Sequence, residues 1–205
     1  YTTGFNYHFG NISPKKIAVT ETQLGIGLDM YLGSDYKTYQ EYGFPNYFRE
    51  TMASEYLVAD ALKGWLLTEF DTLMTKTGKP LIEELIDRGK ILYILDQMTD
   101  IEKKHTLFGF TEQKYQWCVE HEKQMWTQLV NKNLLFSKKT HEIEPFFMEG
   151  PFTKDFPKES PAKALEYIGY RMILSYCEHY ECDQAFDLIN QNNTVLFNTS
   201  KYKPK

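Results

Sequence analysis

Apolar residues recur at helical spacing over most of this chain. From Ser54 onward they return every three or four positions, which predicts a helix that ends near Gly78. The same period predicts further helices; they span 81–98, 111–136 with Thr111 as the cap, 160 onward with Ser160-Pro161 as the first turn, and 183–189. The pattern is typical of a mainly helical protein.

The first fifty residues follow a different pattern. Residues 1–9 alternate loosely and residues 16–20 are short and β-branched, which predicts two strands around a loop that contains Pro14. Residues 21–32 read as a helix that ends at Gly33, and 36–46 as a Tyr-rich loop or short helix broken by Gly43 and Pro45. We therefore expect a mainly α (α+β) fold with a small N-terminal β element, formed by 1–205 as a single domain.

The stretch Leu-Gly-Ile-Gly-Leu-Asp-Met-Tyr-Leu-Gly at 24–33 has two glycines spaced as in a phosphate-binding loop. The third glycine of G-x-G-x-x-G is replaced by Met30, and the glycines lie inside the apolar run instead of before it. We expect Gly25 and Gly27 to let another backbone approach closely. Asp29 should cap or hydrogen-bond a neighbouring segment.

Composition narrows the class of protein. The 205 residues are enough to bury a core, and 15 Tyr and 14 Phe argue against disorder. The net charge is −5 with scattered Lys and Arg, so the chain has no basic field for nucleic acid. The three cysteines are an odd number and predict no complete disulfide framework; Cys118 and Cys177, in apolar helical patterns, should be small core residues.

Metal-ligand spacing is missing from the sequence. None of the five His forms an i, i+4 pair, and the positions that would complete H-E-x-x-H after His121 and His141 hold Met125 and Pro145. There is no G-x-S-x-G, and paired acids are expected on solvated faces in a chain with 28 of them. We therefore predict no metal and no cofactor.

One acid stands out because it lies on an apolar stripe. Glu122 shares a helix face with Val119 and Trp126, so its carboxylate should be buried and should need a cation. Arg88 and Arg171 are the candidate partners, since each lies on an apolar-periodic helix. A buried ion pair that ties helices together is favoured, and an acid that serves catalysis or ligand binding is the alternative.

Several stretches, taken in order, resemble one family. They are IGLDMYLG (26–33), EYLVADALKGW (55–65), LIEELIDRGKILYILDQM (81–98), YQWCVEHEKQMW (115–126), SPAKALEYIGYRMILSY (160–176) and SKYKP (200–204). Together they resemble the gliding-motility lipoprotein GldB family of Bacteroidetes. The resemblance implies an exported protein, lipid-anchored in its precursor to the outer membrane and facing the periplasm. The lipoprotein signal and lipidated Cys are expected to precede Tyr1.

The resemblance also implies a distant relation to zincin-like metallopeptidases. When the H-E-x-x-H helix is aligned with this sequence, Asp60 and Gly64 take the positions of the two His, and Ala61 takes that of the Glu. The position of the third zinc ligand falls at Arg88, before Gly89. Zinc would then have lost its ligands, because Gly64 has no side chain and Arg88 repels a cation. Asp60 and Arg88 are expected to form an ion pair in the old metal cavity.

The first functional hypothesis is a non-catalytic pseudoenzyme that acts by binding. Asp60, Arg88, Glu122 and Arg171 are its candidate binding residues, and the partner is a cell-envelope component or a protein of the gliding or secretion machinery. Aromatic residues of 31–48 either form a contact surface or cover the core as an ordered loop. The alternatives are a peptidase-like hydrolase that uses Glu122 and Asp60, and a structural subunit without a ligand.

Overall fold

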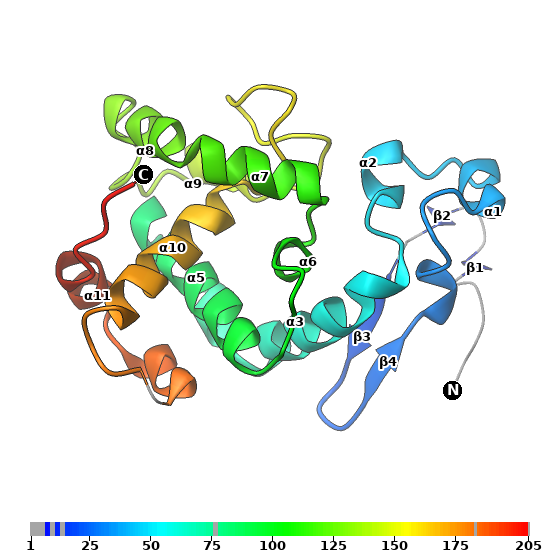
Figure 1. The fold of residues 1–205 in the computed structure, drawn as a ribbon, viewed down its shortest axis with the longest axis horizontal. Helices are drawn as coiled ribbons and strands as arrows, with labels where there is room; N and C mark the ends of the chain where they lie inside the picture. Colours follow the sequence, from blue (N-terminus) through cyan, green and yellow to red (C-terminus); the bar gives the residue numbers. More distant parts are fainter. Residues whose placement is uncertain (1–6, 9–10, 13–14, 76–77, 183, 205) are drawn as a thin grey trace.

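The computed structural model describes residues 7–8, 11–12, 15–75, 78–182 and 184–204. This part of the chain is mainly helical, with its paired strands confined to the N-terminal end, which confirms the predicted fold class. Figure 1 shows a helical body joined through α3 to a smaller N-terminal region. The helices after the strands are α1 (Lys37–Glu41), α2 (Asn46–Arg49), α3 (Leu57–Glu69), α4 (Asp71–Thr75), α5 (Leu81–Gln97), α6 (His105–Phe108), α7 (Glu112–Glu120), α8 (Glu122–Asn131), α9 (Thr140–Ile143), α10 (Leu165–Cys177) and α11 (Asn193–Thr199).

The N-terminal strands form two antiparallel pairs. β1 (Tyr7–His8) pairs with β2 (Asn11–Ile12), and β3 (Ile17–Val19) pairs with β4 (Leu24–Ile26). The strand expected over 16–20 is confirmed by β3, whereas most of the one expected over 1–9 lies outside the described residues.

The helix predicted over 21–32 is wrong. Leu24–Ile26 is a strand, and only the single 3-10 turn η1 (Leu28–Met30) is helical. Two glycines so close together weaken a helix, and Gly25 pairs with Ala18 across the hairpin instead. The expected close approach occurs at Gly27, where a β-carbon would lie 3.3 Å from the carbonyl oxygen of Lys15. Asp29 accepts a hydrogen bond through its backbone carbonyl from the Tyr39 hydroxyl at 2.5 Å.

The later helices agree better with the sequence pattern. α5 has the predicted bounds almost to the residue, and the Thr111 hydroxyl caps α7 by accepting from the Lys114 backbone N–H at 3.3 Å. The helix predicted through 136 is interrupted at His121, so that α7 and α8 are separate and α8 ends at Asn131. The segment expected as a helix over 183–189 is the 3-10 helix η4 (Ala185–Asn190), and α9, η3 (Glu144–Phe146) and α11 were not expected.

The start of α10 corrects a second prediction. The helix begins at Leu165 and not at Ser160-Pro161, because Lys163 adopts the left-handed backbone conformation with φ +59°. A left-handed residue cannot continue a right-handed helix, so the turn before α10 is a separate structure.

The main core is built around α5. This helix is buried on nearly all sides and packs against α10 and α3 (Figure 1). A helix with apolar residues on every side belongs at the centre of a domain, which explains the even spread of Leu and Ile in 81–95. The buried charged residues of this helix, Asp87, Lys90 and Asp96, each have a polar partner.

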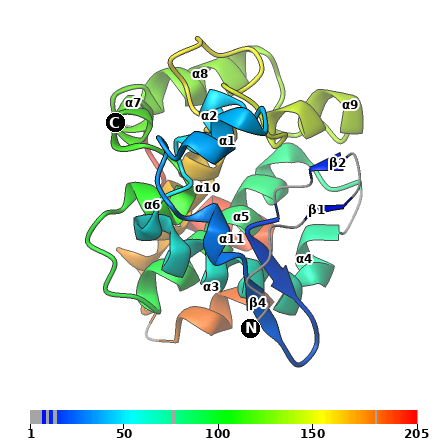
Figure 2. The same ribbon diagram turned by 90° about the vertical axis from the view of Figure 1, so that its right-hand side faces the viewer.

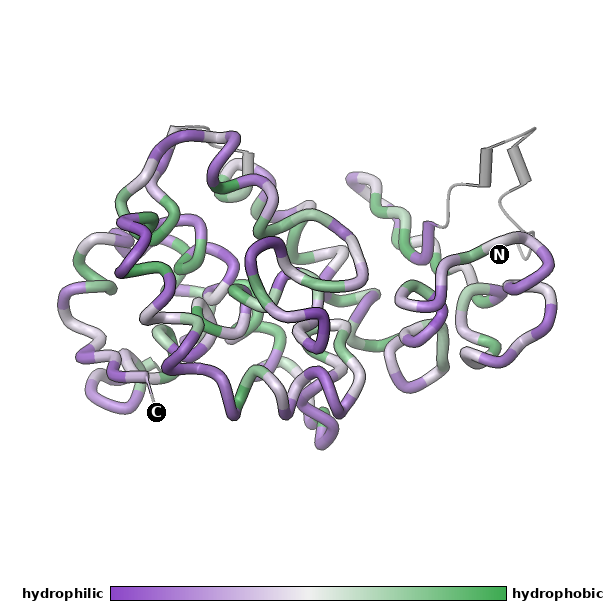
Figure 3. Tube along the Cα trace, turned by 90° about the horizontal axis from the view of Figure 1, so that it is seen from above, coloured by the Kyte–Doolittle hydropathy of each residue, from purple (hydrophilic) through white to green (hydrophobic). Residues whose placement is uncertain are grey.

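A second, smaller core belongs to the N-terminal region, which Figure 3 shows as a projection beside the helical body and Figure 2 shows in front of it. Its buried members are Met30, Tyr31, Tyr39, Phe44, Met52 and Tyr56. Of the two interpretations of the aromatics in 31–48, the ordered, core-covering loop therefore holds for Tyr31, Tyr39 and Phe44. Tyr47 and Phe48 remain half-buried.

The cysteines correct a further prediction. Cys177 forms a disulfide with Cys182 at the end of α10, whereas Cys118 is free and buried, as expected. No helix in the described ranges has the length and apolar character needed to cross a membrane.

Candidate functional site

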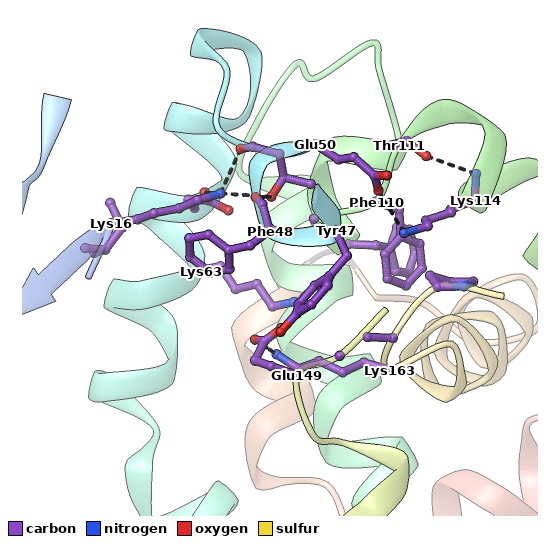
Figure 4. Close-up of a pocket in the computed structure, with 18 of the residues that line it drawn as sticks. Lys16, Tyr47, Phe48, Glu50, Lys63, Phe110, Thr111, Lys114, Glu149 and Lys163 are labelled. Carbon is purple, nitrogen blue, oxygen red and sulfur yellow. Dashed lines mark hydrogen bonds and ion pairs between the residues drawn. The ribbon is translucent and has the colours of Figure 1, made fainter. Parts of the chain in front are cut away.

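A cavity of about 350 Å³ lies where the two cores meet (Figure 4). Ile17 and Phe48, which pack on the smaller core, form one wall, and Leu67, Phe108 and Phe110 of the main core form the other. The remaining lining comes from Lys16, from α2 and the two residues after it, from α3, from α7 and the connection before it, and from the loop 149–163. Segments far apart in the sequence therefore converge on one concave site.

Of the residues that the structure describes, four lysines line this cavity, each from a different segment. Lys16 precedes β3, Lys63 lies on α3, Lys114 on α7, and Lys163 in the turn before α10. Each ammonium is paired with a carboxylate; the pairs are Lys16–Asp60 (3.1 Å), Lys63–Glu166 (2.9 Å), Lys114–Glu50 (2.8 Å) and Lys163–Glu149. The four partner acids differ greatly in exposure, from 4% of the Glu166 side chain to 68% of the Glu149 side chain.

Glu166 connects the cavity to the main core. Its carboxylate is buried and contacts Lys63 at 2.9 Å and the Arg88 guanidinium at 3.2 Å. Burial alone would raise the pKa of this carboxyl, but Lys63 and Arg88 outweigh it and lower the pKa to about 2. Arg88 also lies 3.9 Å above the ring of Phe147, so the guanidinium is held on two sides.

Aromatic rings form the rest of the cavity wall. Tyr47 and Phe48 come from α2 and Phe110 from the connection between α6 and α7, and Figure 4 shows the Tyr47 side chain reaching toward Glu149 and Lys163. The Lys16 ammonium lies 5.8 Å from the centroid of the Phe48 ring. The Tyr56 hydroxyl donates to the carbonyl oxygen of Phe110 at 2.9 Å and so joins the two cores beside the cavity.

Asp60 lines the cavity, as the sequence suggested for a binding residue, but its expected partner is wrong. Its carboxylate contacts Lys16 and accepts a hydrogen bond from the Tyr31 hydroxyl at 3.0 Å. Burial and Asp60 together raise the pKa of Tyr31. Arg88 instead pairs with Glu166 and, at 3.8 Å, with Glu84. The two residues are therefore held in separate ion pairs.

The other positions of the H-E-x-x-H placement also have identifiable surroundings. Ala61 is buried, and Gly64 lines the cavity, where a β-carbon would lie 2.7 Å from Cγ2 of Ile17. β3 therefore packs directly on α3 at Gly64. Within the described ranges, no three His, Cys, Asp or Glu residues are grouped so that they could hold a metal ion.

The predicted burial and pairing of Glu122 are confirmed. Its side chain is 2% exposed, and Arg171 Nε lies 3.4 Å from Oε1. The Tyr202 hydroxyl donates to the same oxygen at 2.9 Å, so the pair also fastens the C-terminal segment. Burial and the Glu122 charge raise the pKa of Tyr202. Glu122 and Arg171 are not among the residues that line the cavity, and their contacts are those of a buried ion pair between α8 and α10.

Sequence reasoning did not assign Lys16, Lys63, Lys114, Lys163 or Glu166 to a site. Glu166 could have been found, because it lies in the apolar run Leu-Glu-Tyr-Ile-Gly-Tyr and gives the same signal as Glu122. The lysines give no such signal, since an exposed lysine and one that lines a cavity look alike in a sequence.

Comparison with known proteins gives one match. The model of the family described as gliding motility protein GldB covers residues 2–204, which is nearly the whole chain. No curated protein and no solved structure shows significant similarity to this chain. The resemblance noted from six separate stretches is thus supported along the full length of the sequence, and the chain belongs to the GldB family of gliding motility proteins.

Proposed function

We propose that this domain is a non-catalytic binding module of the gliding or secretion machinery, and that it holds its partner in the cavity between the two cores. Family membership associates the chain with gliding motility and implies a lipoprotein of the cell envelope. The observation that carries the proposal is the cavity itself, on which four lysines and four aromatic rings of the described residues converge. Concave sites of this kind, with a few convergent polar groups, are where proteins bind ligands.

The state of the acids supports binding over catalysis. A general acid or base must be able to exchange a proton with its substrate. Asp60 is bonded to Lys16 and Tyr31, and Glu122 is buried against Arg171 and Tyr202. The hydrolase alternative needs Asp60 and Glu122 to act together, yet only Asp60 lines the cavity.

The disulfide supports export to the periplasm. Disulfides persist in oxidising compartments and are rare in the cytosol, and Cys177–Cys182 sits at the half-exposed end of α10. The zincin relation stays a prediction. In its favour, Asp60 and Gly64, at the two proposed histidine positions, both line the cavity.

The proposal is tested in a gliding bacterium that lacks its own GldB and is rescued by the full-length precursor of this chain. Tyr47→Ala removes a cavity ring, and Tyr180→Ala removes an exposed ring at the end of α10 as the matched control. We expect colonies that carry Tyr47→Ala not to spread, although the protein level is unchanged. Colonies that carry Tyr180→Ala should spread normally. Normal spreading of Tyr47→Ala would contradict the proposal. Chelator-sensitive peptidase activity of the purified domain would refute its non-catalytic part.

A further inference from the structure

We infer that the cavity binds an acidic peptide segment of a partner protein, in which a carboxylate side chain replaces Glu149 on Lys163 and an adjacent aromatic side chain packs on the cavity rings. This inference rests on the proposed function and names the partner's chemistry. In the free protein, Glu149 then occupies the position on Lys163 that the ligand carboxylate takes in the complex.

The exposure of the four acids singles out Lys163. The side chains of Asp60, Glu166 and Glu50 are 20%, 4% and 29% exposed, so their pairs are parts of the cavity wall. The Glu149 side chain is 68% exposed on a loop, and exposed pairs contribute little to stability. A ligand carboxylate can therefore replace Glu149 at small cost, whereas displacing Glu166 would leave a buried charge without its partner.

The turn that presents Lys163 is fixed by buried hydrogen bonds. The Thr153 hydroxyl donates to the Pro161 carbonyl at 2.7 Å and accepts from the Ala164 backbone N–H at 2.8 Å. The Thr153 backbone N–H donates to the Ser160 hydroxyl at 3.3 Å. These bonds hold Lys163 at φ +59°, a conformation that is uncommon for a residue other than glycine and is often found at functional sites. The ammonium is thus presented at the cavity by a rigid support.

The charge balance favours one carboxylate over a polyanion. The lining holds four lysines against Asp60, Glu50 and Glu149, and Glu166 lies directly behind Lys63. Nucleic acids and other polyanions need an excess of positive charge, which this site does not have. When the Glu149 carboxylate moves away from Lys163, one lysine charge is left unpaired, which one carboxylate of a ligand can balance. Tyr47, Phe48 and Phe110 offer ring faces on which a neighbouring aromatic side chain can pack.

The test selects a random heptapeptide library on the purified protein and measures the affinity of the enriched peptides by fluorescence anisotropy. We expect enrichment of Asp or Glu next to an aromatic residue. Lys163→Met should weaken binding of these peptides at least tenfold, and Lys163→Arg should restore it. Glu149→Gln should tighten binding several-fold, because it removes the competing carboxylate. Lys154→Met, on the same loop and exposed, is the matched control and should bind as the wild type does.

The inference would be overturned if the enriched peptides lacked Asp and Glu, or if they bound Lys163→Met as tightly as the wild type. Weaker peptide binding to Glu149→Gln than to the wild type would also overturn it. Displacement of the peptides by oligogalacturonate at lower concentration than by free peptide would assign the site to an acidic glycan instead. The two proposals fail separately. If spreading depends on Tyr47 but no acidic peptide is enriched, only the inference is lost; if acidic peptides bind through Lys163 but Tyr47→Ala spreads normally, the proposed function is lost.

Discussion

A β-carbon on Gly89 would lie 2.2 Å from the carbonyl oxygen of Gly169, so the backbones of α5 and α10 touch where the two helices cross. The contact is reciprocal, because a β-carbon on Gly169 would lie 1.9 Å from the carbonyl oxygen of Leu85. Atoms at these distances are backbone and cannot rotate away. The crossing therefore requires glycine at both positions, and it sets the distance between the helices that carry Arg88 and Glu166.

Gly169→Ala should destabilise the domain severely. The added methyl forces α5 and α10 apart, and overpacking of this kind costs about 1–3 kcal/mol or more in free energy of unfolding. Gly25→Ala is the control, since its β-carbon would meet Ala18 only at ordinary contact distance, 3.5 Å. Urea denaturation checks both variants. A Gly169→Ala protein as stable as the wild type would show that the helices do not cross in this way.

Glu166 should make stability dependent on acid pH. Its pKa is about 2 in the folded protein, below the ordinary 4.5. A lowered pKa gives stability that is fully present above 4.5 and is lost as the pH falls toward 2, by roughly 3 kcal/mol for a change of this size. The difference in unfolding free energy between wild type and Glu166→Gln should therefore shrink between pH 5 and 2. Glu120→Gln, an exposed acid on α7, should show no such change.

Tyr202→Phe should loosen the C-terminal segment. The change removes the hydroxyl that donates to the buried Glu122 carboxylate and leaves Arg171 as the partner of that oxygen; losing a hydrogen bond to a charged group costs about 1.5–3 kcal/mol. Amide hydrogen exchange of α11 and 200–204 should speed up more than exchange elsewhere. Tyr180→Phe alters an exposed ring and should leave both stability and exchange as they are. Unchanged exchange in Tyr202→Phe would mean that Glu122 is satisfied without it.

Reduction should destabilise the protein moderately. The Cys177–Cys182 bond closes a loop of short sequence separation, 5 residues, for which chain entropy predicts a contribution of about 2 kcal/mol. A reducing agent should lower the melting temperature of the wild type. The double variant Cys177→Ser and Cys182→Ser should melt at the reduced temperature with or without the agent. A wild type that is insensitive to reduction would contradict this assignment.

The parts of the fold that were predictable are those that local pattern determines. α5 follows from its apolar period, the Thr111 cap from its residue type, and the buried, paired state of Glu122 from a charge on an apolar stripe, with Arg171 as one of two candidate partners. The sequence pattern gave wrong predictions where contacts between distant segments determine the local structure. Residues 24–26 became a strand because β3 lies beside them, and α10 starts late because the buried Thr153 bonds impose a left-handed turn on Lys163.

The candidate site was predictable only in part. Asp60 was found, but its partner Lys16 lies 44 residues away, and such pairing leaves no mark on a single sequence. Arg88 was found and given to the wrong acid, since the position of Glu166 depends on the glycine crossing. Lys163 and Glu149 could be recognised only from the shape of the cavity.

The hydrogen bond from Tyr56 to the Phe110 carbonyl has a consequence for the proposed binding site. Tyr56 belongs to the smaller core and Phe110 to the larger, and only Phe110 lines the cavity. The bond ties a wall residue of the cavity to the smaller core, so a substitution at 56 acts on Phe110 without replacing any residue of the lining. Under the proposed function, the fit of the site can therefore change while every lining residue stays the same.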